Sequence, residues 1–506
     1  MSDEFDAVII GSGLGGLTAG ARLSAAGKKV IVLEQHSQAG GFATSFKRKD
    51  FIFDVSMHNI GPLKGYKTLY DILLNLGITD DFEYVKFDGF QHLKFSDNDI
   101  SIPAGFDNYR ALLQESFPAE YEGINTLFDL MEALNSEIME IEKYGVFLDK
   151  ITEKFPLFSL KFPNLVTLTD KTALELVNDY ISDERLKGIL LSTWWICGTP
   201  PSELAAILFC IVTYRYCHTG GGAIKGTSFS LTTAFVKKIR DSGSTVLLKS
   251  RVDKVIVDNG HVTGVMLKNG KVYNAPVVVA NCSPLTLFLE MIESEHIKKS
   301  YLKKIKKMEP SLSAVQLFLG LDKDPFELGM DKPCVVAFDR YSHDDSYKNI
   351  FNRNQNSGFI ALTSYSSFDD SVAKKGKAVL NIMTLDSISN WKGLSKFEYQ
   401  AKKEQVKKQL IKKAGQIVAG IDSHIEVAVL ATPLTMERYT GHTDGAIYGF
   451  AQTNSQSGIN RLTSQTPIKG LYLAGAYTYP GAGYSSVILS GYGAAGFIIA
   501  TDKKKC

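Results

Sequence analysis

A glycine-rich run near the N-terminus has the residue types and the spacing that hold a phosphate. The run Gly11–Gly16 (GSGLGG) lies between an apolar segment over 6–10 and a helical pattern over 14–26. Glycine permits a tight turn here, so backbone N–H groups and the helix N-terminus can approach a pyrophosphate. Glu34 follows a second apolar segment, where its carboxylate can accept both hydroxyls of an adenosine ribose. The pattern predicts a dinucleotide site, with a glycine-rich turn that holds no ligand as the alternative.

The elements that must position this run come from distant parts of the chain. The βαβ unit at the N-terminus reads as two buried strands joined by a helix, and Asn259-Gly260 and Asn269-Gly270 mark two later hairpins. The elements expected in this domain are strands over 6–10, 29–33, 245–248, 252–257, 262–268, 277–280 and 470–474, and helices over 14–26 and 485–500.

Composition and charge exclude several classes of protein. With 506 residues, of which 44% are apolar, the chain is expected to fold as two interleaved domains. The formal net charge of +2 gives no general attraction for nucleic acid. The six cysteines form no CxxC pair and no cluster has metal-ligand spacing, so we expect a reducing compartment and no metal site.

Four separated segments resemble the glutathione-reductase-like flavoproteins, and the resemblance implies FAD rather than NAD. They are Gln38–Gly41 after Glu34, Val252 between hairpin strands, the strand that ends at Asn281, and Gly475–Val487. The residues implied to bind FAD are Gly11, Gly13, Leu14, Gly15, Gly16, Glu34, Gln35, Gly40, Gly41, Val252, Asn281, Gly475, Ala476, Gly483, Ser485 and Val487. Ala476 departs from the pattern, because many members carry an acidic residue there that bonds the ribityl chain.

Over nearly its whole length the chain also resembles the phytoene desaturase, carotenoid isomerase and retinol saturase group. The segments that carry this resemblance are Phe51–Gly61, Gly198–Ser202, Gly220–Gly222, Ala431–Thr440 and Gly445–Gly449. The group implies an FAD-dependent oxidoreductase that desaturates or saturates C–C bonds of an apolar polyene, such as a carotenoid or retinoid, by hydride exchange with flavin N5. A single dinucleotide fingerprint points to a quinone, oxygen, a small reductase or a transiently bound nicotinamide as the electron partner.

Three other functions are open at this stage. Reduced flavin could support cis-trans isomerisation of a carotenoid with no net redox change. The same flavin could act on a fatty acid or an amine, for which Arg215 is the charged partner that the sequence offers. A flavin protein that binds a lipid without catalysis is the third.

The resemblance implies an α/β fold: a Rossmann domain for FAD built from separated segments, an inserted α+β substrate domain and a helical region. The expected segments are 1–95, 216–310 and 441–506 for FAD, 96–215 for the mostly helical region, and 311–440 for the substrate domain.

An apolar substrate needs an apolar tunnel. Aromatic residues near the motifs could line it or simply fill the core: Trp194, Trp195, Tyr214, Tyr216, Phe229 and Tyr448. The polar residues that could handle a proton or hold a substrate head group are His58, Arg215, His218, Tyr448 and Tyr484.

Membrane contact is expected from one side only. The N-terminus is acidic where an export signal would be basic, and the apolar stretch 204–212 falls short of the about 20 residues that span a bilayer. Segment 155–162 combines apolar side chains with Lys154 and Lys161, as a membrane-facing segment would, although core packing accounts for it equally well. The lysine-rich segment 297–308 could face anionic lipid or be a solvated helix. The expected location is cytoplasmic and peripheral to a membrane.

Overall fold

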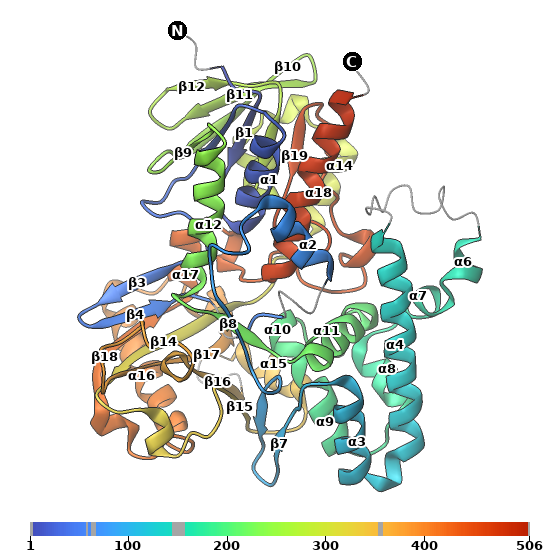
Figure 1. Cartoon of the computed structure of the whole chain (residues 1–506), viewed down its shortest axis with the longest axis vertical. Helices are drawn as coiled ribbons and strands as arrows, with labels where there is room; N and C mark the ends of the chain where they lie inside the picture. The colour runs from blue at the N-terminus through green and yellow to red at the C-terminus, as the bar shows by residue number, and fades with distance from the viewer. Residues whose placement is uncertain (1–3, 57–58, 62–66, 144–156, 353–357, 504–506) are drawn as a thin grey trace.

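The computed structural model describes residues 4–56, 59–61, 67–143, 157–352 and 358–503. Three parts can be followed in Figure 1: a dinucleotide-binding domain that contains both ends of the chain, a substrate domain built on a large sheet, and a helical region beside it.

A parallel sheet of five strands forms the centre of the dinucleotide-binding domain. Its order is β19-β13-β1-β2-β9. The strands are β1 (Ala7–Ile10), β2 (Val30–Leu33), β9 (Thr245–Leu247), β13 (Val278–Ala280) and β19 (Leu471–Leu473). All four residues of β1 and of β2 are buried, since the sheet is covered on both faces.

The two faces of this sheet pack against different layers. Ala7 and Ile9 face a core shared with the helices α1 (Leu14–Ala25), α12 (Ser228–Asp241) and α18 (Tyr484–Lys503). Val8 and Ile10 face the antiparallel sheet of β10 (Val252–Asp258), β11 (His261–Leu267) and β12 (Val272–Asn274). The hairpins expected at Asn259-Gly260 and Asn269-Gly270 connect these three strands.

The substrate domain contains a sheet of seven strands, in the order β18-β14-β17-β16-β15-β6-β7. Its strands are β6 (His92–Lys94), β7 (Asp99–Ser101), β14 (Ser313–Leu321), β15 (Cys334–Phe338), β16 (Phe359–Ser364), β17 (Ala378–Asp386) and β18 (Ile425–Ala431). Helix α16 (Lys396–Ala414) covers one face, and its first turn is held by a capping box between Ser395 and Glu398.

The domain boundary expected at residue 95 is wrong, as the pairing of β6 and β7 shows. His92 pairs with Val335 of β15 and with Ser101 of β7, so β6 belongs to the substrate sheet and not to the dinucleotide-binding domain. Local sequence does not show this, because the partner β15 lies more than 200 residues further along the chain.

The helical region stands beside this sheet, on the right of Figure 1. Its helices are α3 (Phe106–Ser116), α4 (Tyr121–Lys143), α6 (Phe158–Lys161), α7 (Pro163–Thr167), α8 (Ala173–Tyr180), α9 (Glu184–Leu190), α10 (Trp194–Cys197) and α11 (Ala206–Thr219). The buried faces of α3, α4, α8, α9, α10 and α11 form one core with one face of the substrate sheet, whereas α6 and α7 have no fully buried residue.

Helix α18 packs closely on α1 through glycines. A Cβ atom added to Gly491 would lie 2.0 Å from the backbone oxygen of Gly15, and one added to Gly15 would lie 2.7 Å from the Cα of Gly475. Arg22 of α1 adds a cation–π contact to Tyr492 of α18. By length and composition alone, α18 is also the one helix among the described residues that could cross a membrane; 33% of that stretch is buried, where α18 packs into the core that it shares with α1.

We predict that Gly491→Ala destabilises the protein, because the added methyl group forces α18 away from α1. The expected loss is about 1–3 kcal/mol of unfolding free energy, as for overpacked cores, and thermal denaturation measures it. Gly493→Ala is the matched control in the same helix, where no atom lies within 4 Å of the added group. Equal melting temperatures for the two variants would contradict the close packing.

Candidate active site

One continuous cavity joins the glycine run to the substrate domain. Its volume is about 1170 Å³, and its lining passes from Gly11 through the α18 N-terminus to Met383 of the substrate sheet. Pockets for one small ligand measure about 300–1,000 Å³. The cavity is therefore large enough for an extended cofactor and a second molecule that meet inside it.

Glu34 defines the end of the cavity next to β2. The carboxylate accepts hydrogen bonds from Ser12 N (2.9 Å), Ser12 Oγ (2.6 Å) and His36 N (2.8 Å). Val252 lines the same end. These contacts hold the Glu34 carboxylate at the place where a dinucleotide's ribose is expected.

The glycines of the run leave space only for backbone. A Cβ added to Gly13 would lie 2.7 Å from Asn281 Nδ2, and one added to Gly16 would lie 2.2 Å from Gly11 O. The N-cap of α1 is Gly13, and no side chain caps this helix. The first N–H groups of α1 are therefore free to bind an anion such as a pyrophosphate.

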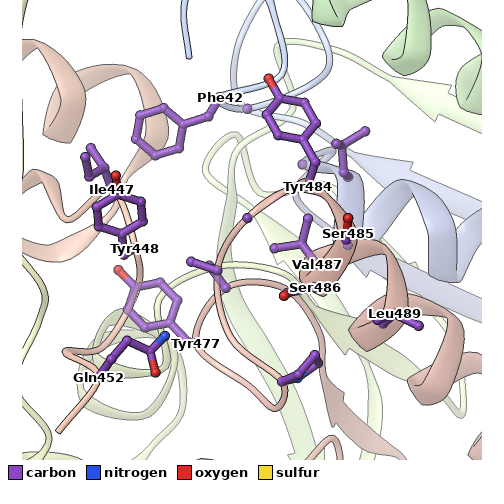
Figure 2. Close-up of a pocket in the computed structure, with 18 of the residues that line it drawn as sticks. Phe42, Ile447, Tyr448, Gln452, Tyr477, Tyr484, Ser485, Ser486, Val487 and Leu489 are labelled. Atoms are coloured by element: carbon purple, nitrogen blue, oxygen red, sulfur yellow. The ribbon is translucent and has the colours of Figure 1, made fainter. Parts of the chain in front are cut away.

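The C-terminal half of the cradle is the loop between β19 and α18. Figure 2 shows Tyr484, Ser485 and Val487 at the start of α18, facing Tyr448 and Tyr477 across the pocket. Gly475 N donates to Ser490 Oγ at 3.0 Å, which ties the loop to the helix. The helix N-terminus is thus directed at the cavity, as a flavin ring and ribityl chain require.

The structure brings most of the sequence-predicted cofactor residues together. Those that line the cavity are Gly11, Gly13, Leu14, Gly15, Glu34, Gln35, Gly40, Gly41, Val252, Asn281, Ala476, Gly483, Ser485 and Val487. Gly16 and Gly475 do not line it; they allow the close backbone contacts behind it. His58 lies outside the described residues.

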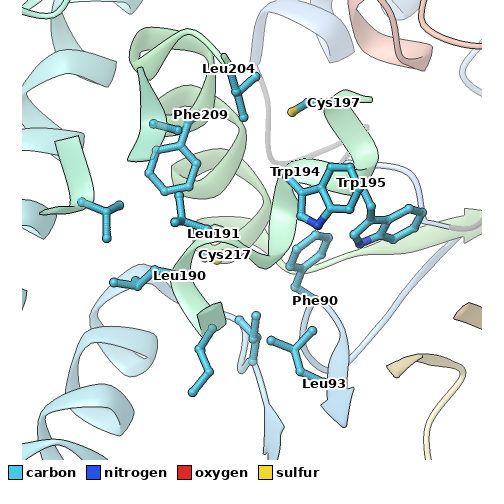
Figure 3. Packing of buried hydrophobic residues seen from close by; sticks show 14 of the residues in the cluster. Phe90, Leu93, Leu190, Leu191, Trp194, Trp195, Cys197, Leu204, Phe209 and Cys217 are labelled. Atoms are coloured by element: carbon cyan, nitrogen blue, oxygen red, sulfur yellow. The ribbon is translucent and has the colours of Figure 1, made fainter. Parts of the chain in front are cut away.

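Beyond the cradle the cavity continues as a tunnel with apolar walls. We call the tunnel the part lined by α4, α6, α7, α10, α11, the substrate sheet and Tyr448. Four of the six predicted aromatic residues line it: Trp195, Tyr214, Tyr216 and Tyr448. The other two do not line it, and for Trp194 the alternative of core packing holds. Trp194, which Figure 3 shows beside Trp195, is fully buried and packs on Phe359. Phe229 lies on α12, outside the lining.

Tyr448 and Tyr484 line the cavity, but both hydroxyl groups already have partners. Tyr448 Oη donates to Trp195 O at 3.0 Å, and Tyr484 Oη lies 2.9 Å from Ser56 Oγ. Desolvation raises the pKa of both phenols well above the ordinary value. They therefore stay protonated at neutral pH, and their rings form an aromatic wall.

In the part of the tunnel wall that the structure describes, the charged side chains are Glu142 and Arg215. Arg215 Nη2 lies 3.0 Å from Glu142 Oε1, and Arg215 Nε donates to Asn135 Oδ1 at 3.3 Å. The Arg215 charge is balanced by Glu142, so a substrate carboxylate would meet a carboxylate here as well. His218 also lines the cavity, stacked on Tyr214 with 5.2 Å between the rings.

Two residues of the site were not predicted from the sequence. His442 lines the cavity between Phe42 and Tyr477, and burial lowers its pKa, so its ring is neutral. Arg461 is buried and donates hydrogen bonds to the backbone around Ala476. Neither residue lies in a sequence motif. Their partners are mostly backbone groups and rings from other segments, which residue types do not reveal.

The prediction of no metal centre remains a prediction. Among the described residues, Glu293, Glu295 and His296 have ligand atoms within 4.8 Å of one another. The two glutamates are exposed, and the group lies outside the cavity lining.

Comparison with known proteins relates the chain to flavoproteins. The sequence profile described as flavin containing amine oxidoreductase matches residues 14–499. The chain is similar to a chloroplastic prolycopene isomerase of Daucus carota, with 27% identity over 97% of this chain and 79% of that protein. An all-trans-retinol 13,14-reductase of Danio rerio is 24% identical (94% and 82%), and a 4,4'-diapophytoene desaturase of Methylomonas sp is 26% identical (96% and 94%).

Solved structures show the same fold. An oxidoreductase from Methanosarcina mazei has a TM-score of 0.64 with 17% identity, over 96% of this chain and 98% of that one. Cyclohexylamine oxidase from Brevibacterium oxydans has a TM-score of 0.63 with 15% identity, over 99% of both chains. With the glycine cradle and the two helix N-termini, the flavin profile identifies the dinucleotide as FAD.

We predict that Glu34→Gln weakens FAD binding about 10- to 100-fold, because hydrogen bonds to a charged group contribute about 1.5–3 kcal/mol. Titration of apoprotein with FAD, followed by fluorescence, measures the change. Asp253→Asn is the control, since Asp253 is an exposed carboxylate in the same cavity lining. A similar loss in both variants would show that general charge, and not the contacts of Glu34, holds the cofactor.

Proposed function

Because the chain belongs to the flavin-containing amine oxidoreductase family, we propose that this FAD-dependent oxidoreductase desaturates or saturates C–C bonds of an apolar polyene such as a carotenoid or retinoid. The observation that carries the proposal is the apolar tunnel that opens into the FAD cradle. The names of its relatives, which include a desaturase, a retinol reductase and a carotenoid isomerase, support the same substrate class.

The walls of the cavity determine what the protein itself contributes. FAD supplies hydride exchange at N5 when it is bound. Tyr448, held by Trp195 O, and Tyr484, held by Ser56, present aromatic faces on which a flat conjugated chain can lie. The thiol of Cys197 has its pKa raised to about 12 by burial, so it stays neutral and unreactive. The protein thus orients the chain and excludes water.

Other substrates find less support in the described part of the tunnel. A fatty acid would need an unbalanced cation, whereas Arg215 is paired with Glu142 at 3.0 Å. An amine would need an unbalanced carboxylate, and Glu142 is neutralised by the same pair. A neutral polyene needs neither, so it fits the wall best.

The electron partner is proposed to be a separate molecule. The described residues contain one parallel sheet with one glycine-rich phosphate loop, which FAD uses. We therefore propose that a quinone, oxygen or a separate reductase exchanges electrons with the flavin.

The decisive experiment is anaerobic incubation of oxidised and of reduced enzyme with a C30 or C40 polyene and with retinol, followed by mass spectrometry. We expect a product that differs from the substrate by two mass units, with matching bleaching or recovery of flavin absorbance. An isomer of unchanged mass would identify a cis-trans isomerase instead. If no polyene changes and a substrate amine or fatty acid does, the polyene assignment is wrong.

We further propose that the protein is cytoplasmic and touches a membrane through α6 and α7. Leu157 and Leu160 are 67% and 75% exposed, while Phe158 of the same turn lines the tunnel. Val166 of α7 is 43% exposed. Exposed apolar side chains next to the tunnel lining would let a water-insoluble substrate pass directly from lipid. Residues 155 and 156 of the predicted segment lie outside the described residues.

We predict that Leu160→Asp reduces binding to phosphatidylcholine–phosphatidylglycerol vesicles at least about tenfold, because burying one leucine contributes about 1.5–3 kcal/mol. Co-sedimentation with vesicles measures the effect. Phe397→Asp is the control, because Phe397 is 82% exposed but lies on α16, away from α6 in Figure 1. The proposal fails if Leu160→Asp binds like the unmodified protein, or if Phe397→Asp loses binding equally.

A further inference from the structure

Arg461 is a fully buried arginine that joins two walls of the cavity. Its side chain is 1% exposed. Nη2 donates to Ala476 O at 2.6 Å and to Tyr448 O at 3.4 Å, and Nη1 donates to Gln452 Oε1 at 3.1 Å. Ala476, Tyr448 and Gln452 all line the cavity. One guanidinium therefore fixes the cofactor loop relative to the aromatic wall of the tunnel.

The charge of Arg461 is not balanced within the described part of the chain. Its hydrogen-bond acceptors are backbone carbonyl groups and one amide, and none is a carboxylate. Burial lowers its pKa to about 9, so the guanidinium keeps its proton at neutral pH. Its titratable neighbour Tyr477 has its pKa raised by burial and stays neutral. A buried cation with neutral partners creates a positive potential in the adjoining cavity.

We propose that Arg461 is a positioning residue for FAD: it holds the Ala476 loop in place and supplies a positive charge that favours the reduced cofactor. Reduction adds negative charge to the flavin, and charges near its ring tune the potential. Ala476 has no polar side chain to hold the ribityl chain, so the loop backbone must be held from behind. This role follows from FAD binding and does not depend on which substrate the tunnel accepts.

Two substitutions separate the charge from the hydrogen bonds. Arg461→Gln removes the charge, whereas Arg461→Lys keeps it but loses the planar fork that reaches several carbonyl groups. The readouts are the dissociation constant of FAD and the midpoint potential of the bound flavin, both at the lowest pH at which all variants stay folded, because burial lowers the pKa of a lysine and it keeps its charge only in acid.

For Arg461→Gln we expect FAD to bind at least tenfold more weakly. The preference for reduced over oxidised FAD should also fall about tenfold, which lowers the midpoint potential by about 30 mV for a two-electron couple. For Arg461→Lys we also expect weaker FAD binding. Its preference for reduced over oxidised FAD should stay within twofold of that of the unmodified protein. An unchanged potential in Arg461→Gln, or an equal shift in both variants, would overturn the proposed role of the charge.

Arg22→Gln is the control for a purely structural effect. Arg22 also donates to a backbone carbonyl, that of Tyr492, but it does not line or border the cavity. We expect a lower melting temperature with an unchanged potential. If Arg461→Gln does not fold, the lysine variant decides alone: its potential must fall further below that of the unmodified protein as pH rises, because a buried lysine loses its proton first. A constant difference would overturn the proposal.

Discussion

The close approach of backbone to backbone at Gly15 is the constraint on which the rest of the structure depends. Gly15 lies between Gly475 and Gly491, and an added Cβ at any of these contacts would come within 2.0–2.8 Å of another atom. This contact holds α18 against the first turn of α1. The N-termini of both helices line the same cavity, where they favour the negative charge of the pyrophosphate and of the flavin ring. The cavity, the tunnel and the aromatic wall are arranged around that point.

Sequence predicts those parts of the fold that depend on residues close together in the chain. The glycine run, Glu34 and the hairpin turn at Asn259-Gly260 each have a physical requirement visible within a few residues, and the structure places them as expected. The boundary expected at residue 95 assigns β6 to the FAD-binding domain, whereas the strand belongs to the substrate sheet. Its partner β15 lies far along the chain, so local sequence does not reveal the pairing. Sequence pattern identifies a strand better than it identifies the sheet to which the strand belongs.

The site was less predictable at the level of single side chains. Trp194 and Trp195 are neighbours in the short helix α10, yet one fills the core and the other lines the tunnel. The direction of each ring depends on the tertiary packing of a four-residue helix, which has no periodicity to read. The role of Arg461 is not predictable from the sequence for a related reason. All but one of its acceptors are backbone carbonyl groups, which residue types do not reveal.

The order of segments along the chain has a consequence for synthesis on the ribosome. Strand β1 forms near residue 7, but β19 and α18, which complete its sheet and the FAD cradle, end near residue 503. The dinucleotide-binding domain therefore cannot close until β19 and α18 have been translated. Until then the apolar face that α18 later covers is accessible to other molecules, so the nascent chain is exposed to aggregation while the two inserted regions are being made.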